Sequence, residues 1–280
     1  MVGESFPSPL WRNKDPMTQA DLTPADHQPG LGLFTLYMRE VRRFMKIPGQ
    51  TVVAPAITTM LFMAVFALAL GRAVNEVNGV PFLVFLAPGL IMMAMLQNSF
   101  ANSSSSLIIA KVQGNIVDLL MPPLGALELL AGLALGAATR GLVVGAFVLI
   151  VMQVFVLLPP ADPLAVIYFA VMACLMMGLM GLLVGIWAEK FDQIAALTNF
   201  FITPLTFLSG TFYSISRLPD SLQFLAHANP FFYAIDGFRY GFTGQADGSL
   251  LIGALFLAGF VAVLGAISWV LLEKGVRLKA

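Results

Sequence analysis

Two residues of opposite charge, Asp236 and Arg239, interrupt an otherwise apolar, aromatic stretch of this 280-residue sequence. Their three-residue spacing places both side chains on one face of a helix, where they can form an ion pair. Ionisable groups in apolar surroundings are costly and by default suggest a functional role. The structural alternative is a pair that fixes the turn of the hairpin that carries it.

The remaining reactive residues form no catalytic constellation. The histidines His27 and His227 belong to no HExxH motif and to no His-Asp-Ser cluster. Cys174 is the one cysteine, so no internal disulfide is possible. The sequence also lacks GxxxxGK followed by Ser or Thr, the loop that cradles nucleotide phosphates. We therefore predict no catalytic residue, metal site or bound cofactor, and we do not expect an enzyme.

Composition points to a membrane protein. Hydrophobic residues make up 59% of the chain and charged residues 11%, with a mean hydropathy of +0.87. Soluble domains have roughly 45–50% apolar and about 25% charged residues. The formal net charge of zero argues against nucleic-acid binding, which needs clustered Lys and Arg.

The N-terminal part divides into two segments. Residues 1–30 are polar and rich in proline, and we predict a disordered cytoplasmic tail. In residues 31–49 apolar side chains recur at three- and four-residue spacing, opposite Arg39, Arg42, Arg43 and Lys46. This pattern predicts an amphipathic helix lying in the membrane interface and attracted to anionic lipid. A basic flank that only sets the membrane orientation is a compatible alternative.

Six apolar stretches lack an internal charge and reach the length of about 18 residues that a spanning helix needs. The predicted spans are residues 52–70, 81–100, 141–158, 164–187, 193–216 and 250–272. Residues 50–280 are therefore predicted to form an all-α membrane domain of six transmembrane helices. Arg140 precedes the third span, so we expect its side chain to snorkel to the cytoplasmic interface. Glycines four residues apart, as at Gly132 and Gly136, are expected to let helices pack closely.

After the fifth predicted span the apolar pattern becomes short. A polar break at residues 216–220 is followed by two apolar pieces, 222–228 and 231–235, and neither is long enough to cross a bilayer. We therefore predict a re-entrant or interface-lying hairpin between the fifth and sixth helices. Non-helical backbone at that depth is tolerated only where protein or a watery cavity satisfies it. The hairpin is thus a candidate lining for a transport route.

Basic residues predict the orientation. Twelve of the 15 Lys and Arg residues fall on one side of the predicted membrane, and only Arg72, Arg217 and Arg239 fall on the other. Cytoplasmic segments carry the excess of Lys and Arg. Both termini and the loop at residues 111–128 are therefore predicted to be cytoplasmic, and residues 217–249 to face outward.

The loop at residues 111–128 contains a second candidate site. A short helix is predicted from Asn115, a suitable N-cap, to Met121, where Pro122 and Pro123 stop it. Such a rigid element suits docking into a groove of a partner protein. The alternative is an ordinary connector whose apolar residues lie back on the bilayer.

Taken together, the order of these features resembles the membrane permease subunit of type-2 ABC exporters, the family of drug, lipid and polysaccharide exporters. The resemblance covers most of the chain from Leu31 onward and rests on three stretches. These are LFTLYMREVRRFMK, GNIVDLLMPPLGALELLAG and PLTFLSGTFYSISRLPDSLQFLAHANPFFYAIDGFRYGF. The first 30 residues do not match the family pattern.

The resemblance implies roles for particular positions. The loop helix would enter a cleft on a separate ATPase subunit, with the coupling contacts Gly114, Asn115, Asp118 and Leu120. A re-entrant gate near the outer exit would contain Asn229, Pro230, Asp236 and Arg239. ATP and magnesium would bind to the partner subunit, and two copies of the chain, or two related subunits, would enclose the pathway in the inner membrane.

The predicted function is therefore export of an amphipathic or hydrophobic substrate, driven by ATP that a separate subunit hydrolyses. An ion-coupled secondary transporter is the alternative. Such a transporter usually shows inverted repeats and polar or charged groups near the middle of its spans. The predicted spans contain no carboxylate, and the two halves of the sequence show no repeat.

Overall fold

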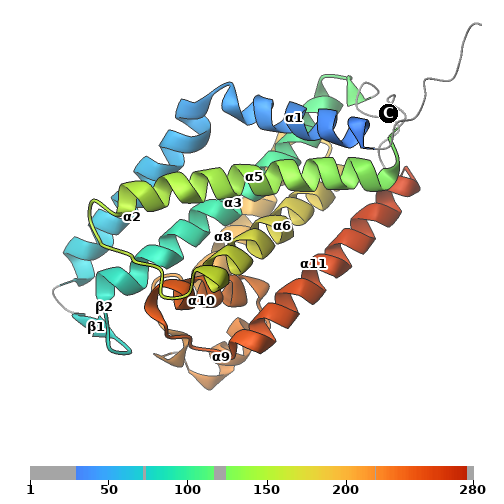
Figure 1. Cartoon of the computed structure of the whole chain (residues 1–280). Coiled ribbons are helices and arrows are strands. Elements are labelled where there is room, and N and C mark those ends of the chain that lie inside the picture. The colour runs from blue at the N-terminus through green and yellow to red at the C-terminus, as the bar shows by residue number, and fades with distance from the viewer. Residues whose placement is uncertain (1–29, 72–73, 117–123, 218, 276–280) are drawn as a thin grey trace, which may run out of the picture.

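The computed structural model describes residues 30–71, 74–116, 124–217 and 219–275, as an assembly of long helices with a small β-hairpin (Figure 1). The first half contains α1 (Leu31–Met45), the π-helical turn η2 (Gly49–Val53), α2 (Ala54–Leu70), β1 (Glu76–Val77), β2 (Val80–Pro81), α3 (Phe82–Val112) and α5 (Ala126–Met152). The second half contains α6 (Pro163–Trp187), α7 (Phe191–Leu197), the π-helical turn η3 (Thr198–Ile202), α8 (Thr203–Leu208), the 3₁₀ turn η4 (Ile215–Arg217), α9 (Asp220–His227), α10 (Pro230–Thr243) and α11 (Leu250–Glu273).

Helix α3 forms the centre of the structure. It packs along α5 and α6 and also contacts α2 and α10. In its most apolar 18-residue window 83% of the residues are buried, against 22% for the helix formed by η2 and α2 and 17% for α11. The exposed faces of α2 and α11 are nevertheless apolar. Such faces fit hydrocarbon or another protein surface rather than water.

Glycines allow the central helices to approach one another. A Cβ atom added to Gly132 would lie 2.6 Å from the Leu36 side chain of α1, and one added to Gly185 would lie 3.0 Å from Leu107 of α3. At Gly181 the added atom would collide with the backbone carbonyl of Phe100. The prediction that four-apart glycines serve helix packing is therefore confirmed.

Five helices within the described residues are long and apolar enough to cross a membrane, compared with six predicted. They are Gly49–Leu70, Phe82–Val112, Ala126–Met152, Pro163–Trp187 and Leu250–Glu273. The predicted fifth span at residues 193–216 forms consecutive α7, η3 and α8 segments that end at Leu208. A turn with Gly210 at φ 76° follows, and this left-handed conformation favours glycine and ends the helix. The predicted end at residue 216 is therefore wrong.

Three other predicted boundaries are also wrong. Helix α3 was expected to end near Phe100, but it continues to Val112 because its polar residues find partners inside the protein. Ser104 donates to the Phe100 carbonyl at 2.8 Å and Ser103 donates to the Gly178 carbonyl of α6 at 2.6 Å. Helix α5 begins at Ala126 instead of residue 141 and ends at Met152 instead of residue 158.

The connections at the α10 end contain one predicted and one unpredicted feature. A break was predicted at residues 216–220; the helix already ends at Leu208, and the η4 turn lies between α8 and the short helices α9 and α10. Both helices are too short to span a bilayer. The antiparallel β1–β2 hairpin was not predicted. Its turn residues, Asn78 at φ 52° and Gly79 at φ 78°, are the Asn-Gly pair that tight hairpins prefer, so the sequence did contain the signal.

Candidate functional site

Buried polar groups gather at two ends of α3. At one end Phe85 contacts Arg239, and at the other Ser106 contacts Glu40. These positions are 21 residues apart (106 − 85), which corresponds to roughly 32 Å along a helix. A bilayer hydrocarbon core is about 30 Å thick, so the two clusters fit opposite membrane surfaces. We call them the Arg239 end, built from Asp236, Arg239 and Asp247, and the Glu40 end, built from Glu40, Arg43, Asn102 and Ser106.

Arg239 of α10 is bound almost entirely by main-chain groups. Its Nε donates to the Phe85 carbonyl at 3.2 Å, and its Nη2 donates to the Gly210 carbonyl at 2.6 Å and the Thr211 carbonyl at 3.4 Å. The guanidinium carbon also lies 3.8 Å from the centre of the Phe85 ring, a cation–π contact. Arg239 therefore joins α10 to the start of α3 and to the turn that follows α8.

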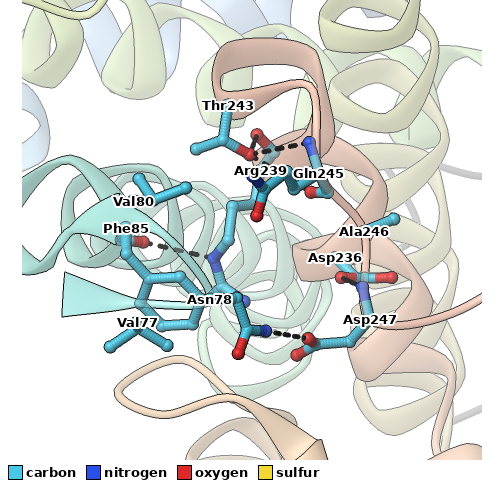
Figure 2. Close-up of a pocket in the computed structure, with 10 residues that line it drawn as sticks. All are labelled: Val77, Asn78, Val80, Phe85, Asp236, Arg239, Thr243, Gln245, Ala246 and Asp247. Atoms are coloured by element: carbon cyan, nitrogen blue, oxygen red, sulfur yellow. Dashed lines mark hydrogen bonds between the residues drawn. The ribbon is translucent and has the colours of Figure 1, made fainter.

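Asp236 and Arg239 both line the cavity shown in Figure 2, but the predicted ion pair is absent. No salt bridge joins these two residues, both of which belong to the described part of the chain. Asp236 instead accepts hydrogen bonds from the amides of Asp247 at 2.9 Å and Gly248 at 3.0 Å. Two main-chain donors satisfy its carboxylate, so a direct contact with Arg239 is not needed.

Asp247 connects three loops at the same cavity. Its carboxylate accepts from Asn78 at 3.0 Å, from the Ser214 hydroxyl at 2.7 Å and from the Ile215 amide at 3.2 Å. The Asn78 contact is visible in Figure 2. Asp247 could not be selected from the sequence, because a loop aspartate has no distinguishing pattern. The cavity of about 290 Å³ is therefore enclosed by groups that already bind one another.

Burial shifts the titration of both charged groups on α10. It raises the pKa of the Asp236 carboxyl, while the amides of Asp247 and Gly248 and the charge of Arg239 act in the opposite direction. Burial lowers the pKa of the Arg239 guanidinium to about 10, and the nearby Asp236 and Asp247 carboxylates oppose that change. Arg239 therefore remains a cation at neutral pH.

The other two predicted gate residues lie at the beginning of α10, away from this cavity. The Asn229 side chain caps the helix by accepting from the Phe231 amide at 3.1 Å, and Pro230 occupies the first helical position. The Asn229 amide also donates to the Leu205 carbonyl at 2.9 Å and the Ser209 hydroxyl at 2.8 Å. The four predicted gate residues thus share one helix but do not form one site.

Glu40 is the centre of the opposite end, and the sequence reasoning missed it. Its side chain is completely buried, and its carboxylate accepts from Ser106 at 2.7 Å, from Arg43 at 2.8 Å and from Asn102 at 3.4 Å. An acidic residue four positions after Leu36 and four before Phe44, both buried, interrupts the apolar stripe of α1. That interruption is the sequence feature that could have identified Glu40.

The amphipathic helix therefore differs from its prediction. Arg39, Arg42 and Lys46 are exposed, as expected of a basic face. Arg43 instead turns inward and donates to Glu40, to the Asn102 carbonyl at 2.6 Å and to Ser105 at 3.1 Å. The helix packs on α5 and is fixed to α3 by these buried charges, so contact with lipid headgroups alone does not account for its position.

The loop predicted to dock a partner begins beside this cluster. A cavity of about 230 Å³ is lined by Arg39 and Arg43 of α1, by Ser106 of α3 and by Asn115 of the loop. Gly114 adopts φ 74°, a left-handed conformation that suits glycine at the end of α3. Ile116, at the start of the predicted short helix, is buried. Asp118 and Leu120 lie outside the described residues.

The sequence predicts that Arg140 lies just before a span, but in the structure it lies in the middle of α5. It is the fifteenth of the 27 residues of α5, and its Nη2 donates to Asn98 of α3 at 3.1 Å. Asn98 is itself buried and donates to the Ala94 carbonyl. Placing an arginine at the centre of a spanning helix costs about 2.5–3.5 kcal/mol on insertion scales. The prediction was wrong because the charge of Arg140 interrupts the apolar pattern, although α5 continues through it.

The long apolar helices and the polar clusters at their two ends define a polytopic helical membrane protein. Residues 32–243 match the ABC-2 type transporter family, and the chain belongs to that family. It is thus the transport-permease type of subunit, which is not itself an enzyme. The resemblance stated from the sequence is confirmed.

Three relatives each cover between 73% and 89% of the chain. The inner membrane transport permease YadH of Escherichia coli is 37% identical over 250 residues, covering 89% of this chain and 98% of the relative. Nodulation protein J of Sinorhizobium fredii is 24% identical over 206 residues, covering 73% and 79%. Nodulation protein J of Rhizobium leguminosarum is 24% identical over 250 residues, covering 88% and 95%.

Proposed function

We propose that this chain is the membrane subunit of an ATP-driven exporter in the inner membrane, with both termini in the cytoplasm. Two copies enclose a route for an amphipathic or hydrophobic substrate, which leaves the cytoplasm or the inner leaflet. A separate ABC ATPase subunit binds ATP and magnesium and hydrolyses the nucleotide. Membership of the ABC-2 type transporter family supports the permease role, and the YadH relative supports the inner membrane.

The observation that carries the ATPase-driven mechanism is the arrangement of the Glu40 end. Asn115 at the start of the proposed docking loop shares a cavity with Arg39 and Arg43 of α1. Arg43 binds Glu40, and Glu40 binds Ser106 of the central helix α3. A protein that binds the loop would therefore act on α1 and α3, which these buried charges join.

Exposed apolar side chains support a second copy. Ile57 and Leu61 of α2 and Phe200 and Phe201 of η3 each expose more than 60% of their surface. Lipid can cover such side chains, but a second helical bundle covers them equally well. In the proposed dimer these faces of α2 and η3 lie next to the route.

The positions of the carboxylates disfavour the ion-coupled alternative. Secondary transporters place coupling groups near the middle of their spans. Within the five described spans, the only Asp or Glu residues are Glu128, in the first turn of α5, and Glu273, at the end of α11. Neither residue is placed to carry a proton or cation at mid-span.

The test is recovery of the ATPase from gently solubilised membranes with the tagged chain, followed by measurement of ATP hydrolysis. We expect a soluble P-loop protein to co-purify with the wild type and to be lost with Asp118→Arg, while the variant still inserts into the membrane. Gln245→Arg, an exposed change beside the Arg239 end, is the matched control and should retain the ATPase. A chain that purifies alone and without ATPase activity would contradict the proposal.

A further inference from the structure

A cavity lies at the side of α3, facing α7 and η3, and extends from Ser105, next to the Glu40 end, to Gln97. Its volume is about 690 Å³. On α3 the cavity is lined by the polar side chains Gln97, Asn98 and Ser105, here called the polar wall, beside Phe100 and Ala101. Opposite them the apolar Ile194 and Ile202 lie among the polar Thr198, Asn199 and Thr203. Polar and apolar side chains together suit a ligand that has both kinds of surface.

The cavity lies at membrane depth. Asn98 is 13 residues from Phe85 (98 − 85) and 8 residues from Ser106 (106 − 98), which corresponds to roughly 20 Å and 12 Å along α3. A smaller cavity of about 260 Å³ between α2 and α3 shares Gln97 and Asn98 with the first. These two residues therefore face cavities on both sides of the central helix.

Positive charge lies directly behind the polar wall. Arg140 of α5 donates to the Oδ1 atom of Asn98 at 3.1 Å, and Arg43 of α1 donates to the Ser105 hydroxyl at 3.1 Å. The two arginines are close enough to repel each other electrostatically. Each guanidinium thus binds a side chain that lines the cavity.

This positive charge is only half compensated. Arg43 forms a salt bridge with Glu40, but no carboxylate of the described residues lies within salt-bridge distance of Arg140. The Nε atoms of Arg43 and Arg140 are buried and have no hydrogen-bond partner among the described residues. The cluster of Glu40, Arg43 and Arg140 therefore carries one excess positive charge in surroundings of low dielectric, where it acts strongly on a nearby anion.

We propose that the cavity binds the anionic head group of an amphiphilic cargo. The phosphate or carboxylate lies against Gln97, Asn98 and Ser105, and the hydrocarbon part lies against Ile194 and Ile202. The Gln97 side chain makes no hydrogen bond to another described residue, so its amide is available to donate to the anion. The excess charge repels cationic amphiphiles from the same wall. This inference rests on the proposed transport function and specifies its substrate class.

The first test compares the binding of two probes to the purified full-length chain in a nonionic detergent. The probes are dodecyl phosphate and dodecyltrimethylammonium, which share a chain length and differ in charge, each competing against a fluorescent dodecyl phosphate. We expect the phosphate to bind at least about tenfold more tightly, because only it gains from the excess positive charge. Equal affinities for the two probes would overturn the inference.

Charge variants assign that preference to the cavity. Asn98→Asp places a carboxylate against Arg140 and cancels the excess charge, so the preference for phosphate should fall to near unity. Arg140→Lys keeps the charge and should retain the preference, which separates electrostatics from folding. Lys274→Gln removes an exposed cation at the end of α11 and is the matched control, expected to behave as the wild type. A full preference in Asn98→Asp would overturn the inference.

The ATPase complex distinguishes cargo from a permanently bound lipid. Dodecyl phosphate should stimulate ATP hydrolysis by the wild-type complex and not by the Asn98→Asp complex. Binding to the wild type without stimulation would overturn the assignment as cargo. If the ATPase co-purifies but the two probes bind equally well, this inference is wrong and the proposed function stands. If dodecyl phosphate binds more tightly but no ATPase co-purifies, the proposed function on which the inference rests is wrong.

Discussion

The Arg239 end and the Glu40 end each bury a charged side chain, but the partners of the two charges differ in kind. Three main-chain carbonyls bind the Arg239 cation, and they belong to α3 and to the turn after α8. Side chains from α1 and α3 bind the Glu40 anion. A charge bound by main-chain groups fixes the course of the chain, whereas side chains can change partners by rotating.

This difference suggests different mechanical roles. At the Arg239 end, Asp236 and Asp247 also bind backbone amides, so loops and short helices are held together as one unit. At the Glu40 end, the contacts join two helices that are far apart in sequence and lie beside the proposed docking loop. We therefore expect changes at the Arg239 end to affect stability alone. Changes at the Glu40 end should affect both stability and the coupling to the ATPase subunit.

The largest effect is expected from removing the buried cation. Arg239→Met leaves the carbonyls of Phe85, Gly210 and Thr211 without their donor, and each buried unpaired group costs about 1–3 kcal/mol. We expect a loss of about 3–5 kcal/mol in the free energy of unfolding. Heating the purified chain and following the reaction of buried Cys174 with a thiol-reactive dye measures this loss. Arg42→Met, at an exposed site, is the control and should stay within about 0.5 kcal/mol of the wild type.

A smaller loss is expected at the other end. Glu40→Gln keeps the shape of the side chain but removes the negative charge opposite Arg43, and a hydrogen bond to a charged group contributes about 1.5–3 kcal/mol. The same dye assay measures the effect. Combining Glu40→Gln with Arg43→Gln should cost less than the sum of the single changes, because each change alone leaves a charge unpaired. Simple additivity would show that the two residues do not act as a pair.

The two ends also differ in how far the sequence predicts them. The polar break after residue 215 and the short helices that follow could be read from hydropathy and proline positions, and so could the family resemblance. The partners of Asp236 and Arg239 could not. Spacing along α10 suggests that they bind each other, but the chain brings backbone amides and carbonyls from distant loops to both of them.

Errors at the Glu40 end have a different cause. A hydropathy pattern counts Asn102, Ser106 and Arg140 as polar interruptions, although each finds a partner on a neighbouring helix. The sequence therefore predicted an early end for α3 and a late start for α5. A helix whose polar groups are satisfied by other helices continues through them, and that depends on tertiary packing, which a single segment does not reveal.

Packing at the Glu40 end can be tested without changing a charge. A Cβ atom added to Gly136 would lie 2.6 Å from the Glu40 Cβ atom, so Gly136→Ala pushes α1 away from α5. Overpacking of this kind typically costs about 1–3 kcal/mol. Gly259→Ala on α11 is the matched control, because no atom of the described residues lies within 4 Å of its added atom. We expect the control to gain about 0.5–1 kcal/mol from helix propensity. Equal stability of the two variants would contradict close α1–α5 packing.

The smallest effect is expected from a single carboxylate at the Arg239 end. Asp247→Asn replaces one accepting oxygen with an amide that donates, so Asn78, Ser214 and the Ile215 amide cannot all keep their acceptor. The loss of one hydrogen bond corresponds to about 1 kcal/mol. Asp192→Asn at the exposed start of α7 is the matched control and should leave the unfolding temperature unchanged. If Asp247→Asn destabilised the chain as much as Arg239→Met, the loops would depend on Asp247 rather than on the buried cation. The Arg239 end would then be held together, like the Glu40 end, by the contacts of a single carboxylate.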